Sequence, residues 1–94
     1  MTSALLNADD FCVFTFISTS HALKAEKVLK EKQLEFIIMP TLREISSSCG
    51  LSIKIFPDNL ETYREILVEQ KVTVEGVYRI KKVKGKNQVV KLND

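Results

Sequence analysis

The fold is decided by residues 11–33, FCVFTFISTSHALKAEKVLKEKQ. Residues 11–17 are apolar, aromatic and β-branched, which is typical of a strand buried on both faces. Residues 18–20, Ser-Thr-Ser, can accept hydrogen bonds from the first N–H groups of a helix. Residues 21–33 carry alanine and aliphatic side chains at three- and four-residue spacing, which predicts an amphipathic helix. The stretch is therefore a buried strand followed by a capped helix.

The rest of the chain repeats this strand–helix plan. Strands are expected at residues 34–39, 51–56 and 72–80, and a helix at residues 60–71. Apolar and polar side chains alternate in the strand at 51–56, which predicts one solvent-facing side. The order β-α-β-β-α-β is that of the split βαβ, ferredoxin-like fold. We therefore expect an α+β sandwich with a four-stranded antiparallel sheet, strand three between strands one and two, and both helices on one face. Residues 83–90 could add a C-terminal hairpin.

Length and charge limit the domain organisation and the partners. A chain of 94 residues suffices for one domain. We divide it into a frayed leader (residues 1–10), a ferredoxin-like domain (residues 11–80) and a basic extension (residues 81–94). The net charge of +2 is too small to imply nucleic acid, and the extension has few aromatic side chains to stack on bases. We therefore interpret the extension as a solvated edge and do not expect nucleic-acid binding.

Compartment and metal chemistry follow from what the sequence lacks. No stretch approaches the roughly 18 apolar residues of a membrane span, and the N-terminus has no signal-peptide pattern. We therefore expect a cytoplasmic protein without membrane contact. Two cysteines and one histidine are too few for a closed zinc site, so no metal or other cofactor is expected. Cys12 is interpreted as a small buried apolar residue, too far from Cys49 for a disulfide.

One loop concentrates reactive side chains. Residues 43–50 read REISSSCG and end where the third strand starts. In the expected topology this loop lies beside the N-terminus of the first helix, which carries Ser20 and His21. A helix N-terminus has about half a positive charge and N–H donors without intrahelical partners, and these stabilise a nearby thiolate. We therefore expect Cys49 to be a reactive, partly exposed thiol.

The residues around this cysteine have candidate roles. Arg43 could position an anion because its guanidinium is always charged. His21 could act as a base or as an anion contact. Gly50 could allow a close approach of the backbone or a positive φ. The candidate site therefore has Cys49 as its reactive thiol and the binding residues Arg43, Ser48, Gly50, Ser20 and His21.

Each of these residues also has a structural interpretation. Cys49 could fill a small gap at the start of a strand, and the three serines before it could be loop formers that bond to their own backbone. His21 could be an ordinary surface residue, and Arg43 could pair with Glu44. The residues alone leave these alternatives open.

Two strings of residues resemble a known family. Residues 14–30, FTFISTSHALKAEKVLK, and residues 39–53, MPTLREISSSCGLSI, are similar to the selenium/sulfur carrier protein-like family of short bacterial domains. The resemblance extends over residues 11–78, and PTLREISSSCG is its most specific part. It implies a cysteine that carries sulfur or selenium as a persulfide or selenopersulfide, and on this chain that cysteine is Cys49.

The sequence thus favours a carrier or relay over a stand-alone enzyme. Its partners would be a cysteine desulfurase, or another sulfur or selenium donor, and an acceptor protein. An alternative from a different class is a small-molecule or anion-binding regulatory module in which Cys49 is incidental. Ferredoxin-like domains often associate through sheet edges or faces, so a homodimer with a ligand site at its interface is part of that alternative.

Overall fold

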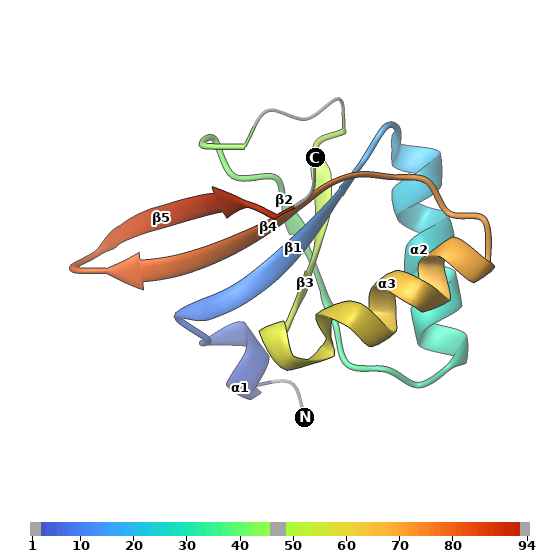
Figure 1. Ribbon diagram of the computed structural model, residues 1–94, viewed down its shortest axis with the longest axis horizontal. Helices are drawn as coiled ribbons and strands as arrows, with labels where there is room; N and C mark the ends of the chain where they lie inside the picture. The colour runs from blue at the N-terminus through green and yellow to red at the C-terminus, as the bar shows by residue number, and fades with distance from the viewer. Residues whose placement is uncertain (1–2, 46–48, 93–94) are drawn as a thin grey trace.

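The computed structural model of the protein describes residues 3–45 and 49–92, so the predicted site residue Ser48 lies outside the described residues. In chain order (Figure 1) the elements are helix α1 (Ser3–Leu6), strand β1 (Asp10–Phe16), helix α2 (Thr19–Glu31), strands β2 (Ile37–Pro40) and β3 (Leu51–Ile55), the 3₁₀ turn η1 (Pro57–Asn59), helix α3 (Leu60–Glu69), and strands β4 (Val74–Val83) and β5 (Lys86–Lys91). None of the helices in the described ranges has the length and apolar character needed to cross a membrane.

The strands form one antiparallel sheet in the order β2-β3-β1-β4-β5. The predicted α+β class is confirmed, and β3 lies between β1 and β2. The prediction of four strands is wrong, because β4 continues to Val83 and pairs with β5, which makes five strands. Lys84 and Gly85 form the connecting turn with φ angles of 53° and 78°, and two consecutive left-handed residues are what a tight hairpin needs. The basic extension is therefore part of the sheet as far as Lys91.

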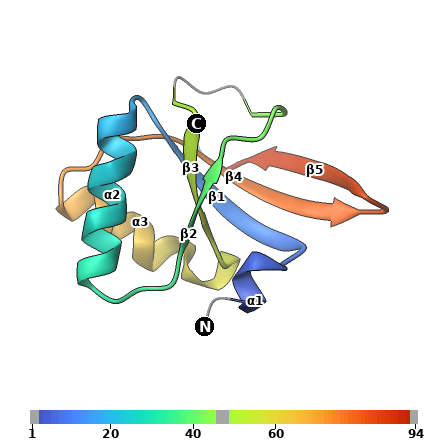
Figure 2. The same cartoon turned by 180° about the vertical axis from the view of Figure 1, so that it is seen from behind.

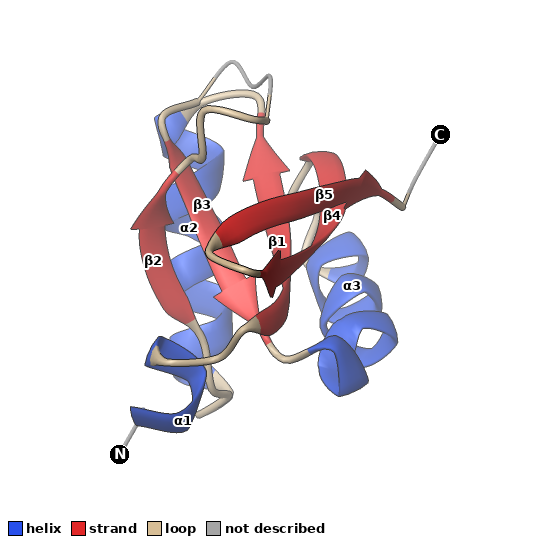
Figure 3. Ribbon diagram, turned by 90° about the vertical axis from the view of Figure 1, so that its left-hand side faces the viewer, coloured by secondary structure: helices blue, strands red, loops and turns tan. Residues whose placement is uncertain are grey.

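The central strand β1 is buried on both faces, as its composition predicts. A first cluster joins one face to the apolar sides of both long helices: it includes Cys12, Phe14 and Phe16 from β1, Ala25 and Leu29 from α2, and Leu67 from α3. A second, smaller cluster on the opposite face contains Phe11, Val13, Ile45 and Ile80. Figure 3 shows α2 and α3 together behind the sheet. Helices α2 and α3 thus cover the same face of the sheet.

Helix α2 begins at Thr19 because the preceding residue, Ser18, caps it. The backbone of Ser18 is extended, and its Oγ accepts a hydrogen bond from the backbone N–H of His21 at 3.4 Å. This is the N-cap arrangement that the Ser-Thr-Ser stretch predicts. The cap determines where the helix N-terminus lies on the sheet, and the candidate site is built around that position.

The face of the sheet opposite α2 and α3 is more covered than the sequence indicates. The alternation in residues 51–56 predicts a solvent-facing Lys54, but only 8% of Lys54 is exposed. Part of the cover is α1, which occupies a segment expected to be a frayed leader and whose Leu5 is fully buried. The carbonyl of Leu6, at the end of α1, accepts a hydrogen bond from Lys54 Nζ at 3.2 Å. A four-residue helix has no readable period, so its packing could not be predicted.

An ion pair between β1 and β4 makes stability depend on pH. Arg79 donates through Nε at 3.0 Å and Nη2 at 2.8 Å to the two carboxylate oxygens of Asp10. This hydrogen bonding holds the pKa of Asp10 below its ordinary value of 3.8. A carboxyl group with a lowered pKa in the folded state stabilises the fold fully above its unfolded pKa, and the contribution is lost as the pH falls through the folded pKa.

We therefore expect the free energy of unfolding to fall more steeply with acidification in the wild type than in Asp10→Asn, in the range below pH 3.8. The difference should be small, because the two side chains are 41% and 43% exposed and solvent screens the pair. Urea unfolding curves on both sides of that pH measure it, with Asp58→Asn as a control on an exposed aspartate. Equal slopes for the wild type and Asp10→Asn would show that the ion pair does not contribute.

Candidate functional site

Cys49 lies where the chain enters β3, beside the start of α2. Strands β1 and β3 pair antiparallel with Ser52 opposite Thr15, so the residues before β3 come next to the residues after β1. The residues after β1 are the cap and the first turn of α2. Figure 1 shows the beginning of α2 and the beginning of β3 at the same end of the molecule. Topology therefore brings the cysteine to a helix N-terminus.

Among the described residues, Leu51 and Thr19 place polar groups at the sulfur of Cys49. The backbone N–H of Leu51 donates to Sγ at 3.4 Å, and the hydroxyl oxygen of Thr19 lies 3.8 Å from Sγ. Thr19 is the first residue of α2. An N–H donor and a hydroxyl group stabilise negative charge on a sulfur atom, and the partial positive charge of the helix N-terminus acts in the same direction. The Cys49 sulfur therefore lies against polar groups from the start of α2 and the start of β3.

The prediction that Cys49 is partly exposed is wrong. Only 3% of Cys49 is exposed, and it packs in the helix-side core cluster together with Ile53 and Ile55. The physical reason is the two-residue period of a strand, which continues backward from β3 and turns Cys49 toward the helices. That period is visible in the sequence and could have been used to predict the burial.

Thr41 holds the segment that carries the cysteine. Its hydroxyl donates to the carbonyl of Cys49 at 3.0 Å and lies 2.7 Å from the hydroxyl of Ser52. Its backbone N–H donates to the carbonyl of Gly50 at 2.9 Å. Sequence reasoning missed Thr41, because its role depends on the β2–β3 register, which places the neighbouring Pro40 opposite Leu51. In this register Thr41 links the end of β2 to the segment before β3 by hydrogen bonds next to Cys49.

The other predicted site residues are only partly brought together. His21 lies on the first turn of α2, and its Nδ1 is 2.9 Å from the capping Ser18 Oγ. Ser20 and Arg43 are exposed, and within the described ranges Arg43 forms no ion pair, with Glu44 or with any other acid. Helix α2 and the loop before β3 therefore contribute to the site chiefly through Thr19 and Thr41.

The expectation that Gly50 allows a close backbone approach or a positive φ is wrong. A Cβ atom added to Gly50 would meet no heavy atom within 4 Å, and its φ is not in the positive range. No close approach or left-handed conformation therefore requires glycine at this position. The residue is exposed, and its carbonyl takes part in the strand-like pairing with Thr41.

The second cysteine has a structural position. Cys12 is 1% exposed and packs in the helix-side core, as the sequence predicts. It lies opposite Ile55, toward the other end of β3 from Cys49, and the two cysteines form no disulfide. Burial raises the pKa of the Cys12 thiol above its ordinary value. Cys12 therefore makes a natural control for experiments on Cys49. The described residues contain no cluster of three or more potential metal ligands.

Comparison with known proteins adds one finding. The model of the family described as "Putative Se/S carrier protein-like" matches residues 11–79, which include Cys49 and run from β1 into β4. No curated protein and no solved structure matches the chain. The matched span is well over half of the chain.

Proposed function

The chain belongs to the Se/S carrier protein-like family, and from that premise we propose that it carries sulfur or selenium on Cys49, as a relay between proteins and not as a stand-alone enzyme. We take residues 11–80 as the carrier domain and describe its βαββαβ arrangement as ferredoxin-like. The observation that carries the proposal is the position of Cys49 Sγ between the Leu51 N–H and the Thr19 hydroxyl, at the N-terminus of α2.

The proposed reaction is a transfer between sulfur atoms. The Cys49 thiolate attacks the outer sulfur of a donor persulfide, R–S–SH, and the donor's S–S bond breaks. The donor leaves as the thiolate R–S⁻, and Cys49 becomes a persulfide that keeps the proton on its terminal sulfur. Attack by an acceptor thiolate on that terminal sulfur returns Cys49 to the thiolate. No oxidant or reductant is consumed, because the sulfane sulfur only changes its partner.

The neighbours of Cys49 have separate roles in this scheme. The Leu51 N–H and the Thr19 hydroxyl stabilise the charge on Sγ before attack and after transfer. Arg43 and Ser20 are exposed and are proposed to contact anionic groups of a donor or acceptor protein, together with His21. Ser48 and Gly50 are proposed as binding residues because they flank Cys49 in the chain.

The burial of Cys49 implies that transfer is coupled to local opening. At 3% exposure Sγ is not accessible to the persulfide of a partner protein. Access requires the hydrogen bonds from Thr41 to Cys49 and Gly50 to break, and such local openings are less costly than global unfolding. A persulfide in the closed position would be protected from other thiols, which is useful in a carrier.

The partners follow from the reaction. The donor has to present a persulfide, as a cysteine desulfurase does, and the acceptor has to present a thiolate. We place this exchange in the cytoplasm, where thiols are kept reduced. Association of two copies through the sheet edges at β2 or β5 is also proposed, since these edges have no strand partner among the described residues.

Sulfur loading of cysteine variants tests the proposal. Wild-type protein and Cys12→Ala, treated with a polysulfide and then freed of it, should each retain about one sulfane sulfur per chain, and Cys49→Ala should retain almost none. Cyanolysis of the bound sulfur gives the amount. Cys12→Ala is a matched control because it removes the other thiol by the same substitution. Equal loading of Cys49→Ala and wild type would refute the assignment of the carrier thiol.

A further inference from the structure

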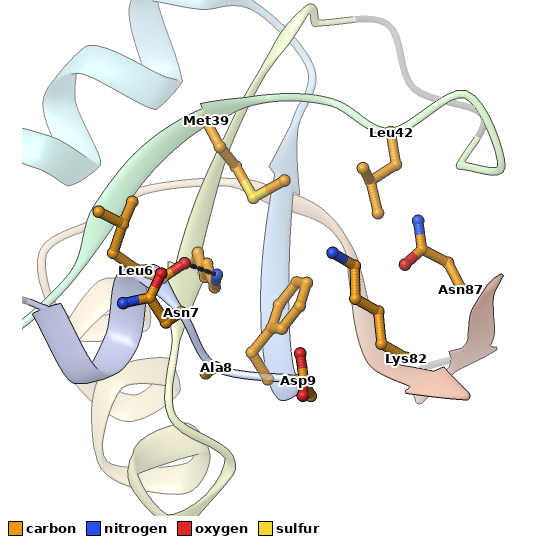
Figure 4. Close-up of a pocket in the computed structure, with 10 residues that line it drawn as sticks. Leu6, Asn7, Ala8, Asp9, Met39, Leu42, Lys82 and Asn87 are labelled. Carbon is orange, nitrogen blue, oxygen red and sulfur yellow. Dashed lines mark hydrogen bonds between the residues drawn. The ribbon is translucent and has the colours of Figure 1, made fainter. Parts of the chain in front are cut away.

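The sheet face opposite α2 and α3 contains a pocket that the carrier chemistry does not use. It has a volume of about 460 Å³ and lies between the α1–β1 connection, the end of β2 with the segment after it, and the turn end of the β4–β5 hairpin (Figure 4). Its lining includes Phe11 and Met39, which belong to the cluster on this face, while Cys49 belongs to the cluster on the other face. The size is that of a site for a small molecule. In Figure 2, which shows the molecule from behind, α1 and the β4–β5 hairpin both lie on the side of the molecule away from α2.

Lys54 is a buried cation in the wall of this pocket. Only 8% of it is exposed. Its Nζ donates to the carbonyl of Leu6 at 3.2 Å and lies 4.3 Å from the centre of the Phe11 ring. Among the described residues no carboxylate forms an ion pair with it. The Leu6 carbonyl and the Phe11 ring offset only part of the free energy that it costs to bury the Lys54 ammonium group. An anion bound beside Lys54 would therefore gain more binding free energy than an anion bound to a lysine at the surface.

A second lysine and one acid complete the charge of the pocket. Figure 4 shows the side chain of Lys82 extending from β4 toward Met39 and Leu42. Burial, the charge of Lys82 and, in the opposite direction, the charge of Asp9 act on Lys54 and together lower its pKa. Asp9 is an exposed residue of the pocket lining. Lys54, Lys82 and Asp9 together give the pocket a net charge of +1. This charge is complementary to a monoanion and not to a dianion.

We propose that this pocket binds a small monocarboxylate with an apolar body. The carboxylate lies between the ammonium groups of Lys54 and Lys82 and gives Lys54 the anionic partner that it lacks among the described residues. The apolar body lies against Phe11, Met39 and Leu42, which give the pocket its hydrophobic wall. The site is independent of Cys49 and of sulfur transfer, since the two lie on opposite faces of the sheet.

Nuclear magnetic resonance titration of the full chain with hexanoate tests the proposal. We expect the methyl signals of Met39 and Leu42 to shift, with a dissociation constant of about 1 mM or below. The neutral isostere hexanamide should bind at least about tenfold more weakly, and inorganic phosphate should also bind more weakly than hexanoate. Lys54→Met and Lys82→Met should each weaken hexanoate binding by about tenfold or more.

Lys81→Met is the matched control, because it removes the same charge from the neighbouring residue of β4. Lys81 lines a recess with Arg79 and Val90 and does not line the pocket. Hexanoate binding in this variant should stay within about twofold of wild type. If Lys54→Met does not fold, hexanoate binding by Lys82→Met still tests the proposal, because Lys82 is exposed and its replacement leaves the core intact. Equal binding of hexanoate and hexanamide, tighter binding of phosphate, unchanged binding in Lys82→Met, or unshifted Met39 and Leu42 methyls would overturn the proposal.

Discussion

Replacement of Thr41 by valine is expected to accelerate alkylation of Cys49 in the folded protein by about ten- to a hundredfold. The hydroxyl of Thr41 donates to the Cys49 carbonyl at 3.0 Å and lies 2.7 Å from the Ser52 hydroxyl. Removing it loses these contacts and leaves buried polar groups with fewer partners, at a cost of about 1–3 kcal/mol. Valine keeps the β-branched shape, so the change acts on the hydrogen bonds more than on packing. This loss of free energy destabilises the closed form of the segment that carries Cys49 and Gly50. The open form, in which Cys49 is accessible, is therefore more populated.

The measurement is the rate of iodoacetamide labelling without denaturant, in a Cys12→Ala background that leaves only one thiol. Thr62→Val, at an exposed position on α3, is the matched control and should react like the parent. Urea unfolding of each variant separates local opening from global unfolding. If Cys49 of Thr41→Val is labelled at the parental rate, access to Cys49 does not depend on the hydrogen bonds of the Thr41 hydroxyl.

Truncation of Phe14 to alanine is expected to cost about 3–5 kcal/mol of unfolding free energy. Phe14 is fully buried in the helix-side core and lies opposite Ile53 on β3 and Val77 on β4. The cavity left by the ring would lie where the sheet and the helices meet. Because a domain of this size is stable by only about 5–15 kcal/mol, the variant should be marginally folded.

Urea titration followed by circular dichroism measures this cost. Ile17→Ala, just beyond the end of the same strand, is the control, since Ile17 is 47% exposed. It should change the unfolding free energy by no more than about 0.5 kcal/mol. A cost below about 1 kcal/mol for Phe14→Ala would show that the core collapses around the missing ring and that β1 is not its centre.

Local patterns predicted the part of the fold that they encode directly. The apolar run of β1 and the Ser18 cap could be read from neighbouring residues, and the structure has both. Burial of Lys54 could not be predicted, because its cover comes from α1, which is distant in the sequence. Residues 83–90 predict a hairpin added to the end of the sheet, and in the structure Lys84 and Gly85 form the tight turn that joins β4 to β5.

The candidate site was predictable in its location and not in its contacts. Topology alone places the start of α2 beside the start of β3, and the structure has Thr19 next to Cys49. The contacts of Thr19 and Thr41 required the side-chain positions and the β2–β3 register. The burial of Cys49 was the avoidable error, since the alternation of β3 extends back to it. The expectation of a partly exposed thiol rests on the position of Cys49 in a loop beside a helix N-terminus, and it leaves out the periodicity of the strand that follows.

The most direct test of the account is to locate transferred sulfur on the chain. Wild-type protein would be incubated with a persulfide donor, blocked with an alkylating agent, digested and analysed by tandem mass spectrometry. The account predicts an additional sulfur atom on the peptide that contains Cys49 and an unmodified thiol at Cys12, which is buried in the core at the other end of β3. Additional sulfur on Cys12, or a Cys49 that is alkylated directly and never carries sulfur, would contradict it.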